Sequence, residues 1–389
     1  MPERRKKLKP IFRFAHPFFT TAPPKERSII PGIGQRLSDY IKGTLHPVPK
    51  TRGSGRIALS SIVGSKGSQE IEKEGSIIFH AVGDTGKRPD SPEQMVSDAM
   101  SMDYDIKNPG KSPAFFLHLG DVIYGSNKDQ AYRREFYEPY MHYPGKIIAI
   151  PGNHDGEIFP KTDPVSLRAF LLNFCAMKSK VPPIAGSIYR ETMTLPGVYW
   201  LLETPFIDII GLDSNSAENP GFISGKIPGN AQKQWLIANL RYIKTSRHGK
   251  SRKGLIITTH HPPFSQGGHS GSTEMLADID DACKQEGIYP DVFLSGHAHS
   301  YQRYARKMIV DGVEREILFI VAGTGGVGEQ GVPDANGQIV GDAAFVKSYK
   351  GYGFLLVTAK AGSIAAEYFA VNVNDSSRTR IDSVQVGLI

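Results

Sequence analysis

Short apolar runs alternate with amphipathic stretches through the first half of the chain. Compact apolar runs cover residues 77–82, 114–119 and 146–150, and each is followed by glycine or proline within two residues. Such short runs with a breaker behind them are typical of buried strands. Residues 94–102 and 130–140 lie between them and have helical spacing. The alternation predicts a parallel sheet with helices packed on it.

The second half continues the α/β pattern after an insertion at residues 156–196, which holds one expected helix over 166–177. We expect a hairpin of two strands over 198–202 and 206–212, followed by a helix over 231–243. Three further strands are expected over 255–259, 292–295 and 317–322, and a closing antiparallel pair over 353–358 and 363–371. The residues from 374 onward are polar, and they predict either a tail or a final edge strand.

The first 75 residues differ from the remainder in composition and in charge. They are rich in Pro, Gly, Ser, Lys and Arg, with only a short helix over 33–41 and a strand over 57–63 expected. Their 15 basic and 6 acidic residues give +9, whereas the rest of the chain carries −2. We therefore expect a basic, partly ordered extension at 1–75 and a main domain at 76–389.

The basic run Arg4–Lys9 is interpreted as a flexible, solvated tail. A weak contact with an anionic surface is the alternative, and the charge of the main domain indicates no clear nucleic-acid partner. No apolar run approaches the roughly 20 residues that a spanning helix needs. The run Ile11–Phe19 is interrupted by charge and proline, so it makes a poor signal peptide and a cytoplasmic protein is expected.

The two cysteines, Cys175 and Cys283, are far apart and lack the spacing of a metal site. We therefore expect two buried free thiols rather than a disulfide. The sequence does not specify the oligomeric state.

Polar side chains follow five of the expected strands directly. The blocks are Gly83–Gly86, Gly120–Tyr124, Gly152–Asp155, Ile257–His260 and Gly296–His299, and they supply Asp84, Asp121, Asn153, His260, His297 and His299. Side chains just past strand ends lie on the rim where α/β folds build their sites. Two carboxylates, one amide and three imidazoles exceed the needs of one ion, and they suit two ions sharing a bridging carboxylate.

In these blocks the chain resembles the calcineurin-like metallophosphoesterases over about residues 76–372, and within them the purple acid phosphatases. General members carry a histidine two residues after the first aspartate, where this chain has Gly86. Tyr124, three residues after Asp121, and the run Gly296–Arg303 are similar to the purple acid phosphatase branch. The resemblance implies a four-layer α/β sandwich of two mixed sheets flanked by helices, with 76–389 as the catalytic domain.

The resemblance also implies a ligand set for two metal ions. Asp84, Asp121, Tyr124 and His299 would hold the first ion, and Asp121, Asn153, His260 and His297 the second. Phenolate and carboxylates favour a hard Fe(III), while amide and imidazoles favour divalent Fe, Zn or Mn. The implied reaction is hydrolysis of a small phosphate monoester by a metal-bound hydroxide.

His154 and His269 are the expected catalytic residues, because they resemble the family's phosphate-contacting and substrate-side histidines. Asp155 is a candidate to orient His154. For His269 the alternative is an exposed loop histidine. His80 and His118 are expected in the core, His261 beside the ligands or simply packed, and Gly323–Gly326 in a tight turn at the rim of the site.

Two alternative functions stay open. A phosphodiesterase of the same superfamily would act on a cyclic nucleotide, a nucleic acid or a phospholipid head group. The second alternative is a non-catalytic binding protein with a degenerate site, although the complete ligand set argues against it. Substrate specificity is assigned to residues 156–196 and 214–230, whose shapes the sequence does not give.

Overall fold

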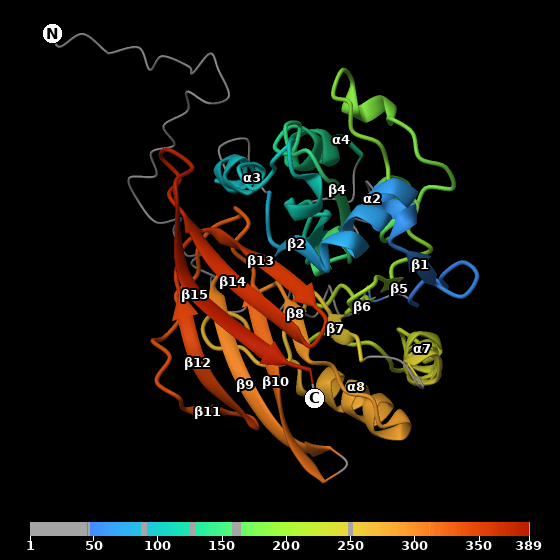
Figure 1. The fold of residues 1–389 in the computed structure, drawn as a ribbon, viewed down its shortest axis with the longest axis vertical. Coiled ribbons are helices and arrows are strands. Elements are labelled where there is room, and N and C mark those ends of the chain that lie inside the picture. Colours follow the sequence, from blue (N-terminus) through green and yellow to red (C-terminus); the bar gives the residue numbers. More distant parts are fainter. Residues whose placement is uncertain are drawn as a thin grey trace, which may run out of the picture.

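Two mixed β-sheets form the centre of the molecule, with helices on their outer sides (Figure 1). The computed structural model describes residues 45, 47–86, 92–124, 129–157, 165–247, 252–310 and 312–388. The α/β class and the pair of mixed sheets expected from the sequence are confirmed. The helix expected over 33–41 lies outside the described residues.

The six-stranded sheet has the order β15-β14-β13-β2-β3-β4. Its parallel half consists of β2 (Ser76–Val82), β3 (Phe115–His118) and β4 (Lys146–Ala149), all close to the expected bounds. These strands are buried on both faces, which explains their continuous apolar runs. β13 (Gly353–Lys360), β14 (Ser363–Val371) and the edge strand β15 (Arg378–Gly387) follow antiparallel, so the chain ends in a strand.

The nine-stranded sheet has the order β1-β5-β6-β7-β8-β10-β9-β12-β11. The expected hairpin is confirmed as β5 (Trp200–Glu203) and β6 (Ile207–Gly211). β6, β7 (Gly254–Thr258), β8 (Val292–Ser295) and β10 (Val313–Ala322) run parallel. Strands β9 (Tyr301–Val310), β11 (Ile339–Val340) and β12 (Ala343–Tyr349), which extend this sheet in antiparallel fashion, were not predicted from the sequence.

The strand expected over 57–63 is wrong beyond its first two residues. Strand β1 (Arg56–Ala58) pairs in parallel with β5, and helix α2 (Ser60–Glu74) begins directly after it. The apolar run divides between the two elements, since Leu59, just before the helix, and Ile62 and Ile71 within it are all buried in the core. Residues 56–74 therefore pack into the sheet structure. Upstream of them, the Arg52 guanidinium donates to the carbonyls of Cys175 and Leu195 at 2.7 Å each, which ties this segment to the insertion.

The remaining helical elements are α3 (Glu93–Ser101), α4 (Asp129–Tyr132) with a π-helical turn at Arg133–Tyr137, α5 (Asn153–Gly156), α6 (Arg168–Phe174), α7 (Ala231–Arg247) and α8 (Thr273–Glu286), with 3-10 turns at Pro109–Lys111 and Pro183–Ala185. They are mostly short, and α3, α4, α7 and α8 among them flank the two sheets (Figure 1). Helices α7 and α8 contact each other beside the nine-stranded sheet. Among these helices, α5 and α8 have no counterpart in the sequence-based prediction.

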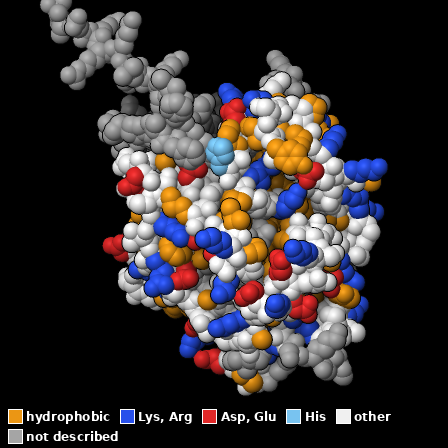
Figure 2. Space-filling view, turned by 45° about the horizontal axis from the view of Figure 1, so that its top comes forward, with side chains coloured by type: hydrophobic (Ala, Val, Ile, Leu, Met, Phe, Trp, Pro, Cys, Tyr) orange, Lys and Arg blue, Asp and Glu red, His pale blue; other side chains and the backbone are white. Residues whose placement is uncertain are grey.

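The surface and the thiols agree with the composition of the main domain. Basic and acidic side chains are both scattered across the face shown in Figure 2, in line with a net charge near zero. Cys175 and Cys283 are buried and free, as expected. Among the described helices, none has the length and apolar character needed to cross a membrane.

Candidate metal centre

The ends of strands from both sheets bring the predicted ligands to one place. Asp84 and Asp121 follow β2 and β3 of one sheet, whereas His260 follows β7 of the other. Their ligand atoms all lie within 4.8 Å of one another, and all three side chains are buried. Because carboxyl ends of parallel strands share one rim, two facing sheets build one cluster from residues far apart in sequence.

One half of the cluster surrounds the Asp84 carboxylate. The Tyr124 hydroxyl donates to Asp84 Oδ1 at 3.2 Å, and His299 Nε2 lies 3.4 Å from the same oxygen. The backbone N–H of His297 donates to Asp84 Oδ2 at 2.7 Å. The structure thus places Tyr124 and His299 beside the carboxylate with which the family resemblance grouped them.

The other half surrounds the Asn153 side chain. Asn153 Oδ1 lies 3.0 Å from His260 Nε2 and 3.0 Å from His297 Nδ1. Asp121 Oδ1 lies 3.4 Å from His260 Nε2, so it faces this half too. All seven predicted ligands therefore converge, with Asp121 close to both halves.

The backbone of the cluster is held in an uncommon conformation. Asp84, Asp121 and His297 have φ angles of 58°, 54° and 68°, in the left-handed region that residues other than glycine seldom adopt. Such strain persists at functional sites where the surroundings fix it. Gly152 is required beside it, because a Cβ there would overlap the Asp121 carboxylate.

Gly86 stands where most of the enzymes that the sequence resembles carry a histidine, and the space around it is already filled. A Cβ at Gly86 would overlap the Glu93 carboxylate and lie 2.9 Å from the carbonyl of Glu135. Burial raises the pKa of Glu93 well above its usual range. Glu135 Oε2 accepts the backbone N–H of Tyr124 at 2.7 Å. The two glutamates fill the space behind Gly86 and fix the Tyr124 backbone on the other side.

The donor chemistry of His260 fits a cation at the cluster. Its Nδ1–H donates to the Leu119 carbonyl at 2.9 Å, which leaves the lone pair of a neutral ring on Nε2. Nε2 faces three oxygen acceptors, Asn153 Oδ1, Asp121 Oδ1 and, at 4.0 Å, Asp84 Oδ1, and it also lies 3.3 Å from His297 Nδ1. Burial lowers the pKa of His260, but the two carboxylates outweigh it and raise that pKa to about 9. A positive charge belongs at this point, as a proton or as a metal ion.

His154 lies at the edge of the cluster, and its partner differs from the expected one. Its Nδ1 forms an ion pair with Glu157 Oε1 at 2.8 Å, and its ring lies 4.5 Å from that of Tyr124. Burial lowers the His154 pKa, but Asp121 and Glu157 outweigh it and raise that pKa to about 10. The carboxylates around His154 therefore favour its protonated form.

Asp155 does not orient His154, contrary to the expectation. Its carboxylate accepts the backbone N–H groups of Gly152 at 2.8 Å, Val122 at 3.2 Å and Ile123 at 3.3 Å. Burial and the Asp121 charge raise the Asp155 pKa to about 7. The Asp155 carboxylate thus accepts buried N–H groups from two loops, and these hydrogen bonds hold it away from the His154 ring.

His269 enters the cluster through its ring, which lies 4.1 Å from the ring of His297. Asn219 Nδ2 lies 3.1 Å from His269 Nδ1, and Gln330 Nε2 lies 2.9 Å from His269 Nε2. Burial lowers the His269 pKa to about 4, so the ring is neutral. Asn219, Gln330 and Glu157 were missed as site residues because no motif marks them, although Asn219 and Glu157 fall in the two segments to which specificity was assigned.

The other singled-out residues support the cluster from outside. His118 accepts from the Gly120 N–H and contacts Thr85 Oγ1 at 3.2 Å, so it braces two of the strand-end turns. His261 contacts Ser214 Oγ and the Ala217 carbonyl, each at 2.8 Å. His80 contacts Tyr143 and Asp103 at 2.9 Å each in the core. The glycine run at residues 323–326 packs on this rim, where the N–H of Gly325 donates to the Gly83 carbonyl.

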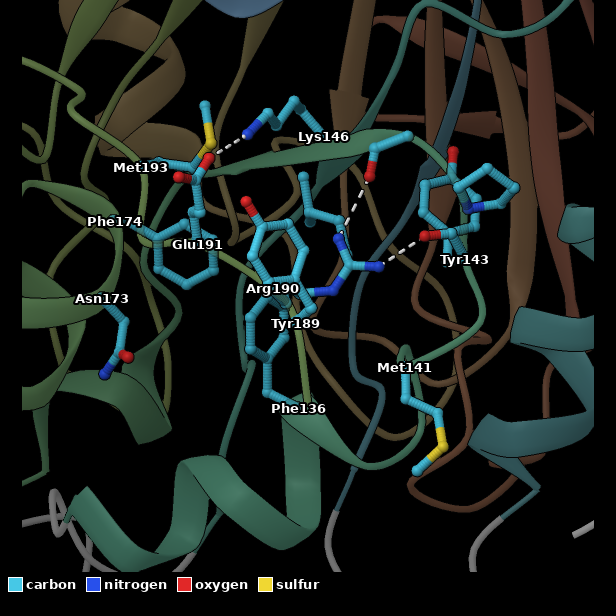
Figure 3. A pocket seen from close by; sticks show the side chains of 13 residues that line it. Phe136, Met141, Tyr143, Lys146, Asn173, Phe174, Tyr189, Arg190, Glu191 and Met193 are labelled. Carbon is cyan, nitrogen blue, oxygen red and sulfur yellow. Dashed lines mark hydrogen bonds and ion pairs between the residues drawn. The ribbon is translucent and has the colours of Figure 1, made fainter. Parts of the chain in front are cut away.

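A separate cavity of about 180 Å³ lies between β4, α6 and the end of the insertion (Figure 3). Arg190 lines it, and its guanidinium donates to the carbonyls of Tyr140, Tyr143 and Gly145. Glu191 is paired with Lys146 at 2.8 Å. The polar groups of this cavity thus hold loops together, and none of the predicted site residues lines it.

Comparison with known proteins agrees with this architecture. The solved structure of PhoD matches with a TM-score of 0.50 and 12% identity, over 80% of this chain and 70% of that chain. A dimetal phosphatase from Danio rerio matches with a TM-score of 0.42 and 12% identity, over 80% of this chain and 98% of that chain. No curated protein matches the sequence. The calcineurin-like phosphoesterase family model matches residues 78–301, which span all the clustered side chains, and the chain therefore belongs to this family of metal-dependent phosphoesterases.

Proposed function

We propose that the chain hydrolyses small phosphate monoesters at a dinuclear centre of the purple acid phosphatase type. The observation that carries the proposal is that Tyr124 takes the place of the ligand histidine that is absent at Gly86. A side chain at Gly86 would overlap Glu93, and the Tyr124 hydroxyl donates to Asp84 Oδ1 at 3.2 Å. A phenol oxygen in that place supports a trivalent iron, because phenolates prefer hard ions.

The proposed ligands divide between two ions as the two halves of the cluster do. Asp84, Tyr124 and His299 would hold Fe(III), Asn153, His260 and His297 would hold divalent Fe, Zn or Mn, and Asp121 would bridge. When bound, such a pair lowers the pKa of a water molecule and neutralises phosphate charge. The His260 N–H to Leu119 supports this assignment, since it directs the Nε2 lone pair inward.

His154 supplies the proton in this proposal. As an imidazolium held by Glu157 and lying 4.0 Å from Asp121 Oδ2, it is placed to bind a phosphate oxygen and protonate the leaving alkoxide. His269, on the opposite side beside His297, would position the ester group. Glu157 keeps the His154 ring charged and oriented.

Phosphodiester hydrolysis is a second candidate, and the charges near His154 favour it. Glu157 and Glu218 both act electrostatically on His154. Their negative charge on the substrate side penalises a dianionic monoester more than a monoanionic diester. The preference for monoesters or diesters depends on how far the two metal ions offset the negative charge of Glu157 and Glu218.

Elemental analysis and a paired substrate panel test the proposal. The purified protein should contain two ions per chain, and metal-loaded enzyme should hydrolyse aryl and alkyl monoesters faster than the matched diesters. Asp121→Ala should lose both ions and all turnover. Faster diester hydrolysis would favour the second candidate, and a protein that binds no metal would favour the non-catalytic alternative.

A further inference from the structure

Asn219 connects the metal cluster with the histidine on its substrate side. Its Oδ1 lies 3.3 Å from His297 Nε2, and its Nδ2 lies 3.1 Å from His269 Nδ1. The centroids of the two rings lie 4.1 Å apart with an interplanar angle of 46°, so one amide contacts a nitrogen of each ring. Neither contact is part of the ligand set or of the catalytic pair described above.

The Asn219 amide determines which nitrogen of His297 carries the proton. An amide oxygen only accepts, so the contact at 3.3 Å requires an N–H on His297 Nε2. The lone pair of the neutral ring is then on Nδ1, which lies 3.0 Å from Asn153 Oδ1 and 3.3 Å from His260 Nε2. Asn219 therefore directs the free electron pair of His297 into the cluster.

The same amide competes with Gln330 for His269. Amide NH₂ groups face both ring nitrogens, and a neutral imidazole has one lone pair to offer. The Asn219 amide is fixed by two donors to its Oδ1, His297 Nε2–H and Ser270 Oγ–H at 3.4 Å. Gln330 Oε1 accepts the His299 N–H at 3.3 Å, so turning the Gln330 amide breaks this one bond, whereas turning the Asn219 amide would break two. The Asn219 amide therefore keeps its orientation and the Gln330 amide turns, so that the His269 proton lies on Nε2.

The loop that carries Asn219 is held firmly enough for this task. Its Gly221 N–H donates to Ser272 Oγ at 3.0 Å, and its Phe222 N–H donates to the Ser214 carbonyl at 2.9 Å. Gly221 also packs against His261 so closely that a Cβ would lie 2.6 Å from that side chain. The loop is thereby fastened to the segment that carries His260 and His269.

We propose that Asn219 is a positioning residue that sets the tautomers of His297 and His269 with one amide. This inference rests on the proposed function, because it assigns His297 Nδ1 to the second ion. Partners that orient a ligand histidine typically change metal affinity 10–100-fold when removed.

Two substitutions separate the two ends of the amide. Asn219→Leu removes both contacts, so affinity for the second ion should fall about 10–100-fold. Asn219→Asp keeps an acceptor for His297 but replaces the donor, so metal affinity should stay within about threefold while the His269 proton moves to Nδ1. Chelator competition with zinc measures the affinity, and ¹⁵N NMR of the imidazoles reports the tautomers in both metal-free and zinc-loaded protein.

Asn108 provides the matched control, since it is exposed and its amide bonds only within its own loop, to Asp105 at 2.6 Å. Asn108→Leu should change neither affinity nor tautomers. Wild-type affinity in Asn219→Leu, or an unmoved His269 proton in Asn219→Asp, overturns the inference. If Asn219→Leu fails to fold, the NMR result for Asn219→Asp decides. Absence of a metal pair from the wild type would instead refute the proposed function, and the tautomers of the metal-free protein would still test Asn219.

Discussion

The ion pair between His154 and Glu157 gives the sharpest test of the proposed proton donor. Glu157→Gln removes one negative charge and preserves the shape of the side chain. The two side chains lie 2.8 Å apart and are only 19% and 11% exposed, so solvent screens the pair weakly. The substitution should therefore act on the His154 pKa and leave the metal ligands in place.

The magnitude follows from the burial of the pair. A hydrogen bond to a charged group contributes about 1.5–3 kcal/mol, and one pKa unit corresponds to roughly 1.4 kcal/mol. Loss of Glu157 should lower the His154 pKa, about 10 in the metal-free protein, by roughly 1–2 units. Nearby cations lower this pKa in both variants, so the difference between the variants persists in the loaded enzyme.

The assay has a kinetic and a thermodynamic arm. Because His154 must be protonated to act as the acid, the alkaline limb of the kcat profile should move to lower pH by about 1–2 units. In metal-free protein the raised pKa of His154 stabilises the fold fully below its unfolded value of about 6.5. That stability is lost as pH rises through about 10. Urea unfolding should thus show Glu157→Gln to be less stable at pH 6 and equal to the wild type above pH 10.

An unmoved alkaline limb, together with equal stability at pH 6, would refute this account of His154. Glu314→Gln is the matched control, because Glu314 pairs with Lys307 at 3.1 Å while both side chains are at least 60% exposed. Such surface pairs contribute little, so the control should change neither profile.

Three further predictions address the remaining assignments. Iron-loaded protein should absorb visible light through phenolate charge transfer, and Tyr124→Phe should abolish the band; a band that survives would remove Tyr124 from the ligands. Gly86→Ala should cost about 1–3 kcal/mol in urea unfolding, because its Cβ would overlap Glu93, and unchanged stability would show that the space is free. Deletion of residues 1–30 should leave hydrolysis of a small soluble ester intact and weaken salt-sensitive binding to anionic vesicles, since the first 75 residues carry the +9 charge; loss of the fold would contradict the separate role of this segment.

The parts of the fold that follow from local patterns were predictable. Strands β2, β3, β4, β7 and β8 are short apolar runs, and each is followed within four residues by a polar side chain of the cluster. Strand β9 was not predictable in this way, because Arg303 and Arg306 interrupt its apolar pattern. Their charges are neutralised by Asp382 and by Asp280 and Asp342, which lie on other elements. Such partners become visible only when the chain is folded.

The same division holds at the site. The sequence alone determined the order and types of the clustered side chains, because a side chain just past a strand end must lie on the rim of its sheet. Tertiary structure decided which neighbours act on them: Glu157 and not Asp155 pairs with His154, Glu93 fills the space at Gly86, and Asn219 reaches two histidines. These contacts join residues by distance and charge, and loop conformation sets both, so no spacing along the chain could reveal them.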